Sequence, residues 1–422
     1  MTALLAAALV ARISLADLDQ PIFDVELSLP AGTVRVCLDR DGAGRFVSGL
    51  KPEADDADCF AAEGPTLRYR LDVAGLARGR GDPDSAARFG NAGFIVSDLA
   101  FLLRPVGADP DTEVRLDWTL PSGISIAAPW TRLPGKAPRF RTTLLQRRTG
   151  SYVAIGKLTS LGSIQVPGGA LHAAVFAGAR RATDDELRSW LRSAGSAVAR
   201  LYGGLPIGDL NALLIPVHSR TPGVFGSVLR ENFASAALLF GDDAEGSSFH
   251  SEWMSFHELF HLGNPRVVGR IPWLTEGLAT YYQDVLRARA GVATPQAMWD
   301  DLLDGLHRFC APEGKGPYLQ RLKQLMRDHE YREYYWGGAC WAFRLDLAVR
   351  QRSGGRRSLD DILRELRAHS MDERLDEAGA VAFLDKATSG AASALLQAEG
   401  SLMPDLAAKG FEEERRAIFA PW

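Results

Sequence analysis

The sequence lacks the features that would mark a membrane-spanning, nucleic-acid-binding or repeat protein. No apolar run among its 422 residues is long enough to cross a bilayer. Its net charge of −4 is too close to neutral to favour nucleic acid or an anionic membrane as a partner. No internal repeat or low-complexity segment stands out. What remains is a globular composition, 46% hydrophobic and 24% charged, in a chain long enough for two or three domains.

Cysteine is also scarce. The four cysteines, Cys37, Cys59, Cys310 and Cys340, are widely spaced and form no CxxC motif, which argues against a cysteine metal cluster. Disulfides between Cys37 and Cys59 and between Cys310 and Cys340 would suit an oxidising compartment. Four buried free thiols are equally compatible with the sequence, so it leaves this choice open.

The amino-terminal segment Leu4–Ala11 resembles the apolar core of a secretory signal, although no positive residue precedes it. We therefore expect a possible leader over residues 1–20, with an ordinary apolar segment as the equal alternative. Together with the cysteines, this segment favours a periplasmic or secreted location over a cytoplasmic one.

Residues 21–168 have the alternating pattern of short strands separated by Gly, Pro and Asp turns, which predicts an antiparallel β domain. The expected strands are 23–29, 33–38, 67–73, 114–118 and 152–156. Residues 169–295 mix strands with helices, among them a helix over 184–202 that Thr183 caps and Gly203 ends. Residues 296–422 are mainly helical. The fold class expected is therefore a multidomain α+β protein.

Histidine is rare as well, with eight residues, yet two of them lie four positions apart in His257-Glu258-Leu259-Phe260-His261. On an α-helix this spacing points both imidazoles to one side, where they could bind one metal ion. Glu258 could then act as general base on a metal-bound water, which is the HExxH arrangement of zinc peptidases. The following Gly263-Asn264-Pro265 predicts the end of the helix, with Gly263 or Asn264 in a left-handed C-cap.

Glu276 is the candidate for a third ligand, because it lies on the next amphipathic helical run, residues 273–282. Apolar neighbours surround it in the sequence, and a carboxylate in such surroundings requires a metal or a cation. The alternative is a surface glutamate. We therefore predict one Zn²⁺ per chain, bound by His257, His261 and Glu276.

Four segments of the second half resemble the glycyl aminopeptidase family, a branch of the gluzincin zinc peptidases related to aminopeptidase N. They are Trp273–Tyr282, Tyr334–Ala339, Leu345–Arg350 and Ser358–Leu363. The resemblance implies an N-terminal β domain, a thermolysin-like α/β zinc domain and a helical C-terminal part. Many members end in a PDZ domain, for which the residues after about 370 are too few.

The resemblance also implies roles for individual residues. The three candidate ligands would bind zinc and Glu258 would activate the water. Tyr335, the tyrosine of a Tyr-x-x-Gly segment, would donate a hydrogen bond to the oxyanion that forms in the transition state. Tyr334 is the competing candidate for that role.

In the aminopeptidases that the chain resembles, a Gly-rich edge strand before the zinc helix presents a glutamate to the substrate's free amino group. The matching stretch here is 223–232, and Glu231 is the candidate. Val228 stands where the family pattern has glycine, and Arg230 adjoins Glu231. An exposed Glu231 paired with Arg230 is therefore the alternative.

The function predicted from the sequence is a zinc metallopeptidase, aminopeptidase-like, that acts on a peptide or protein substrate. The alternatives are a catalytically inactive zinc-fold protein that binds peptides or serves as a scaffold, an endopeptidase, and a hydrolase of a non-peptide amide or an epoxide. The sequence does not determine the oligomeric state.

Overall fold

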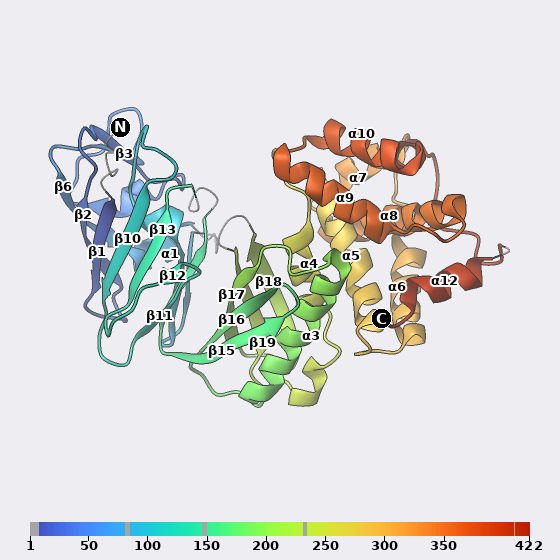
Figure 1. The fold of residues 1–422 in the computed structure, drawn as a ribbon, viewed down its shortest axis with the longest axis horizontal. Helices are drawn as coiled ribbons and strands as arrows, with labels where there is room; N and C mark the ends of the chain where they lie inside the picture. The colour runs from blue at the N-terminus through green and yellow to red at the C-terminus, as the bar shows by residue number, and fades with distance from the viewer. Residues whose placement is uncertain (1–7, 81–84, 146–149, 231–233, 409) are drawn as a thin grey trace, which may run out of the picture. The chain divides into compact units, whose positions relative to one another are not determined.

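The computed structural model describes residues 8–80, 85–145, 150–230, 234–408 and 410–422 (Figure 1). The chain forms two compact units. The first comprises Met1–Ile164, Leu171–Arg181 and Asp209–Ala244, and the second comprises Gln165–Ala170, Ala182–Gly208 and Glu245–Trp422. The domain limits at 168 and 295 that the sequence suggests stay a prediction.

Strands dominate the first unit and form several sheets within the described residues. The largest has the order β12-β13-β10-β1-β2-β6-β4 and is antiparallel except for the parallel pair β1 and β10. Its strands are β1 (Leu9–Leu15), β2 (Ile22–Ser28), β4 (Val47–Ser48), β6 (Thr66–Asp72), β10 (Glu113–Thr119), β12 (Thr131–Arg132) and β13 (Arg139–Thr143).

The remaining sheets have the orders β11-β14-β8-β7, β5-β3-β9 and β15-β16-β17-β19-β18. The four-stranded sheet consists of β7 (Ala86–Phe89), β8 (Gly93–Ser97), β11 (Ser125–Ala127) and β14 (Tyr152–Gly156). The three-stranded sheet consists of β3 (Arg35–Cys37), β5 (Cys59–Ala61) and β9 (Arg104–Pro105). The five-stranded sheet consists of β15 (Leu158–Val166), β16 (Gly169–Phe176), β17 (Asp209–Val217), β18 (Gly223–Leu229) and β19 (Ala234–Gly241). Two short helices, α1 (Val73–Arg80) and α2 (Asp98–Phe101), lie between strands.

The strands expected in the β domain are present, with one difference in pairing. β3 joins the three-stranded sheet rather than continuing the sheet of β2, so the turn at 30–32 leads from one sheet to another. β1 includes residues 9–15 of the segment expected as a leader, and its alternate residues Leu9, Ala11 and Ile13 are buried in the sheet core. Residues 1–7 lie outside the described part of the chain.

The central strands β8 and β14 are buried at every position, so the alternation expected for residues 152–156 is wrong. One set of their side chains, Val153 and Ile155 among them, belongs to the core of the seven-stranded sheet. The other set, with Tyr152 and Ala154, packs with Leu213 of the five-stranded sheet. Because both faces are covered, these strands are uninterrupted apolar runs.

Helices dominate the second unit (Figure 1). They are α3 (Asp184–Tyr202), α4 (Met254–Phe260), α5 (Pro272–Arg289), α6 (Pro295–Phe309), α7 (Tyr318–Arg327), α8 (Tyr331–Ser353), α9 (Leu359–Asp372), α10 (Glu377–Thr388), α11 (Ala391–Gln397) and α12 (Phe411–Phe419). No helix of the described residues has the length and apolar character needed to span a bilayer.

The ends of α3 agree with the sequence prediction. Thr183 and Glu186 form a capping box, in which each side chain accepts a hydrogen bond from the other residue's backbone N–H. Gly203 ends the helix with a φ of +78°, a left-handed conformation that glycine adopts without steric cost.

Two aspartates, the buried Asp346 and the half-buried Asp360, connect α5, α8 and α9. Asp346 of α8 accepts hydrogen bonds from the Tyr281 hydroxyl at 2.8 Å, from Arg350 Nε at 3.0 Å and from the Leu359 N–H at 2.8 Å. The second aspartate, Asp360 of α9, accepts from the Tyr282 hydroxyl and from Arg289, both at 2.7 Å. These two aspartates lie in the segments Leu345–Arg350 and Ser358–Leu363, which resemble the glycyl aminopeptidase family in sequence. Their contacts give both segments a structural role.

All four cysteines are paired. The Cys37–Cys59 disulfide joins two residues that are register partners on β3 and β5, and the Cys310–Cys340 disulfide joins the end of α6 to α8. The structure therefore has the disulfides and not the free thiols that were the alternative.

The disulfides predict the outcome of thiol labelling. Alkylation of the denatured, unreduced protein adds no mass, because every sulfur is in a bond, and alkylation after reduction adds four labels. Intact-mass spectrometry measures the difference. Labelling of four thiols without reductant would contradict the assignment.

Candidate metal centre

The helix α4 begins at a buried carboxylate. Its N-cap residue, Trp253, makes no side-chain capping bond. Instead the Glu252 carboxylate accepts hydrogen bonds from the Met254 N–H, from the Ser255 N–H at 3.0 Å and from Trp190 Nε1 of α3 at 3.0 Å. These bonds satisfy backbone donors of the first helical turn and fix the start of the helix that carries His257.

The helix ends earlier than the sequence suggests. His261 is the first residue of a 3₁₀ turn, His261–Gly263, that follows α4 directly. The left-handed C-cap expected at Gly263 or Asn264 is wrong, because Asn264 has a φ of −58° and a ψ of 148°. Pro265 follows it, and a residue before proline is restricted to such extended conformations.

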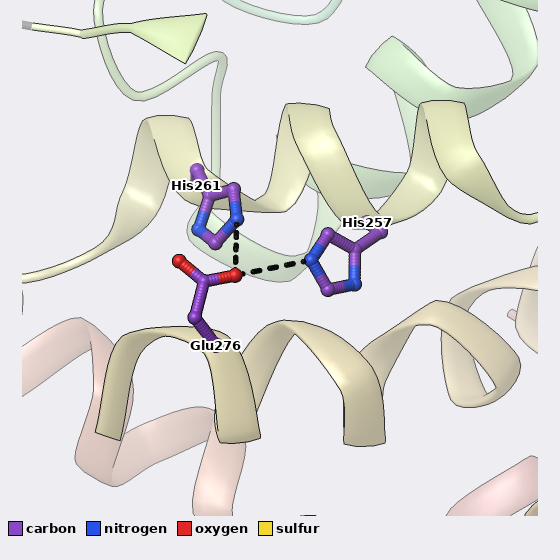
Figure 2. A group of neighbouring side chains, drawn as sticks. All are labelled: His257, His261 and Glu276. Carbon is purple, nitrogen blue, oxygen red and sulfur yellow. Dashed lines mark hydrogen bonds and ion pairs between the residues drawn. The ribbon is translucent and has the colours of Figure 1, made fainter. Parts of the chain in front are cut away.

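Three of the residues predicted from the sequence converge. Figure 2 shows the imidazoles of His257 and His261 directed at one carboxylate oxygen of Glu276, which projects from α5. Nε2 of each histidine lies 3.3 Å from Oε2 of Glu276. One nitrogen or oxygen atom from each of the three residues lies within 4.8 Å of the others. In the described part of the chain, no other group of three or more His, Cys, Asp or Glu residues has this geometry.

The two imidazoles favour the ionised form of Glu276. Burial by itself would raise the pKa of Glu276, but the neighbouring His261 and His257 imidazoles outweigh it and lower that pKa well below its usual range. Glu276 is therefore ionised, although its side chain is only 21% exposed. A carboxylate and two imidazole nitrogens, largely withdrawn from water, are together a suitable donor set for Zn²⁺.

Glu258 lies on the same helix beside this group and is half-buried. Burial is the main cause that raises the pKa of Glu258 to about 7, and the charges of Glu276 and Glu252 add to it. The neighbouring His257 opposes this shift. The carboxyl group is thus within electrostatic reach of the converging side chains.

A close crossing of α5 and α8 positions Tyr335, the candidate oxyanion donor. A Cβ built on Gly277 would lie 2.5 Å from the Gly338 Cα, so the two helix backbones touch at these glycines. Glu276 directly precedes Gly277, and Tyr335 lies about one turn before Gly338. The crossing therefore brings Tyr335 close to the converging side chains.

Tyr335 and Tyr334 differ in their surroundings. The Tyr335 ring stacks on the His257 ring, with centroids 6.4 Å apart and planes at 20°. Burial, followed by the charges of Glu276 and Glu258, raises the pKa of Tyr335 to about 12, so the hydroxyl keeps its proton and can donate it to a hydrogen bond. Tyr334 is 1% exposed and contacts the Trp273 backbone.

The remaining candidate, Glu231, lies outside the described residues. The preceding strand β18 is an edge strand of the five-stranded sheet, as the sequence suggested, and Val228 is paired with Ala236 there. The structure describes neither a contact of Glu231 with a substrate nor its pairing with Arg230.

Two residues that sequence reasoning missed contact the other ring nitrogens of the histidines. Gln283 Oε1 lies 3.1 Å from His257 Nδ1, and Asn264 Nδ2 lies 2.7 Å from His261 Nδ1. The sequence contained a signal for Gln283, because it lies seven residues after Glu276 and therefore on the same face of α5.

Comparison of the sequence with protein-family models and with curated proteins finds no match. Solved structures do resemble the chain. The aminopeptidase N family protein from Idiomarina loihiensis has a TM-score of 0.69 at 18% identity, over 90% of this chain and 73% of that one. A point mutant of the M1 zinc metallopeptidase from Deinococcus radiodurans has a TM-score of 0.58 at 15% identity, over 96% of both chains.

Yeast LTA4 hydrolase in complex with bestatin is a more distant match, with a TM-score of 0.51 at 12% identity, over 95% of this chain and 68% of that one. At these identities the similarity is one of fold. The multidomain α+β fold expected from the sequence, with a β-rich N-terminal part, a mixed α/β part and a helical C-terminal part, is confirmed.

Proposed function

We propose that the chain is a zinc-dependent metallopeptidase that binds one Zn²⁺ through His257, His261 and Glu276. The observation that carries the proposal is the convergence of these three donor groups within 4.8 Å, with Glu258 and Tyr335 beside them. Two imidazoles and one carboxylate are a typical ligand set of catalytic zinc, which keeps one position open for water or substrate. The shared fold with zinc metallopeptidases supports the same function.

The chemistry divides between the ion and the chain. Zinc, when bound, supplies Lewis acidity that polarises the scissile carbonyl and eases the deprotonation of water. Glu258 accepts the proton of the attacking water and passes it to the leaving amine. Tyr335 donates its hydroxyl hydrogen to the oxyanion that develops on the carbonyl oxygen.

Tyr335 is a better candidate for that donor than Tyr334. Its ring lies against the candidate ligand His257, and it is half-buried, so a substrate can reach it. Tyr334 is almost completely buried.

The substrates we propose are peptides with a free amino terminus. A structure of the similar Deinococcus radiodurans enzyme contains the substrate Tyr-Ser-Ala, and two-domain M1 peptidases have been solved with L-arginine and with L-tryptophan. The alternative of an inactive zinc-fold scaffold is weaker, because this chain keeps Glu258 as well as the complete candidate ligand set.

We further propose a periplasmic or secreted location, because the chain has two disulfides and disulfides form and persist mainly in oxidising compartments. Cell fractionation with antibodies against the chain tests this: recovery with the periplasm or the medium is expected, and recovery in the cytosol would contradict it.

Replacement of Glu258 by Gln tests the general base. Peptide hydrolysis should fall by about 10²–10⁴-fold, because a neutral amide cannot accept the proton. The bound zinc should remain, since Glu258 is not a proposed ligand. The matched variant Glu276→Gln should lose zinc as well as activity, as plasma mass spectrometry of the purified proteins will report. A Glu258→Gln protein with full activity would contradict the mechanism.

Replacement of Tyr335 by Phe tests the oxyanion donor. The value of kcat should fall by about 10²–10³-fold while KM changes little, because the lost hydrogen bond forms only in the transition state. Tyr334→Phe serves as the control and should retain most of kcat. The reverse ranking of the two variants would assign the role to Tyr334.

A peptide library presented with free and with acetylated amino termini tests the substrate class. Mass spectrometry of the products should find removal of the first residue from free peptides and little cleavage of acetylated ones. Internal cleavage of both sets would identify an endopeptidase instead. Absence of hydrolysis by zinc-loaded protein would favour the scaffold alternative.

A further inference from the structure

Each candidate histidine ligand contacts a buried side-chain amide through its second ring nitrogen. His257 Nδ1 lies 3.1 Å from Gln283 Oε1, and His261 Nδ1 lies 2.7 Å from the amide of Asn264. Gln283 is 9% exposed and Asn264 is 3% exposed. Neither of these two contacts is with a carboxylate, although metal-binding histidines are frequently supported by one.

The Gln283 contact fixes the tautomer of His257. An amide oxygen can only accept a hydrogen bond, so His257 carries its hydrogen on Nδ1. Nε2 then presents a lone pair toward Glu276, as a metal ligand must. Because Gln283 and Glu276 both project from α5, one helix holds the imidazole at both of its nitrogens.

The Asn264 contact bears on the tautomer of His261. Nδ2 of Asn264 faces His261 Nδ1, while the buried Oδ1 has no hydrogen-bond partner among the described residues. In this orientation His261 would accept at Nδ1 and carry its hydrogen on Nε2, which cannot then bind a metal.

Exchanging the oxygen and nitrogen of the Asn264 amide gives the buried oxygen a partner and also frees His261 Nε2 to bind a metal. The assignment of amide oxygen and nitrogen follows from the hydrogen-bond network and not from shape, so the exchange leaves the position of the side chain unchanged. Oδ1 then accepts from His261 Nδ1–H, which gives a buried acceptor its partner. His261 Nε2 is left with a lone pair, as in His257.

We propose that Gln283 and Asn264 are positioning residues that hold both histidines in the metal-binding tautomer through uncharged amides. This inference rests on the proposed zinc centre. Because the amides add no negative charge beside the imidazoles, the ligands are less basic than they would be with carboxylate partners. Zinc affinity therefore depends on the acceptor oxygens that Gln283 and Asn264 present to the histidines. It should not decrease when Glu or Asp replaces these amides, because a carboxylate keeps an acceptor oxygen.

The test is the Kd of the full-length chain for Zn²⁺, measured by competition with a chelator of known affinity. Gln283→Met and Asn264→Leu keep the approximate volume but remove the acceptor, and each should weaken zinc binding by about 10–100-fold. Gln283→Glu and Asn264→Asp keep an acceptor oxygen and should bind zinc at least as tightly as the unmodified chain. The Asp variant is the most specific, because it has no N–H donor in either orientation.

Tyr281→Phe is the matched control for a loss of helix stability. It removes the buried hydrogen bond between α5 and Asp346 without contact to either histidine. Its midpoint of urea unfolding should decrease while its zinc Kd stays unchanged.

The possible failures can be separated. Unchanged zinc affinity in Gln283→Met and Asn264→Leu, or weakened binding in Asn264→Asp equal to that in Asn264→Leu, would overturn the inference alone. A proportional loss of zinc affinity in Tyr281→Phe would also overturn it, because general destabilisation would then account for the effect. An unmodified chain that binds no zinc would overturn the metal centre and this inference with it.

Discussion

The candidate site depends on the contact between α5 and α8, where Gly277 and Gly338 meet backbone to backbone. The separation of 2.5 Å that a Cβ would have from the opposite Cα excludes every larger residue without a shift of one helix. Glu276 and Tyr335 lie beside this contact on the two helices. The contact therefore determines the position of a proposed zinc ligand and of the proposed oxyanion donor together.

A polar network around Asp346 and Asp360 forms a second set of contacts that hold α5 and α8 together. Asp346 is fully buried, and its carboxylate contacts groups of α5, α8 and the start of α9. Removing one member of such a buried charged network is far more costly than removing a surface pair, typically about 3–5 kcal/mol. Such a network fixes the positions of these helices, which a catalytic site requires because small displacements of a ligand reduce the rate.

Three buried or half-buried carboxylates, Glu252, Glu258 and Glu276, lie on or beside α4 and α5, and each is stabilised differently. Glu252 accepts backbone hydrogen bonds at the start of α4, whereas Glu276 contacts two imidazoles. Glu258 has no side-chain hydrogen bond among the described residues, and burial raises its pKa. This difference matches the proposed roles, because a structural cap and a ligand need permanent partners and a general base does not.

Much of the site was predictable from the sequence because it depends on local periodicity. The spacing of His257 and His261 requires only a helix, and Glu276 requires only a second helix close by. The sequence placed Gln283 on the same face of α5 as Glu276, but its contact with His257 depends on how α4 and α5 pack. The contact of Asn264 with His261 is local and depends on the 3₁₀ turn that follows α4, which the sequence did not predict. The extended conformation of Asn264 follows from Pro265, an effect that the C-cap prediction overlooked. In the β part, the sheet membership of β3 and the burial of both faces of β8 and β14 depend on tertiary pairing that alternation alone does not indicate.

The most direct test of the central claim is anomalous diffraction at the zinc absorption edge from crystals of the purified chain. The account predicts one strong peak per chain, about 2.0–2.2 Å from Nε2 of His257, Nε2 of His261 and a carboxylate oxygen of Glu276. A zinc-supplemented crystal with no peak at these three residues, or with its peak elsewhere in the chain, would contradict it.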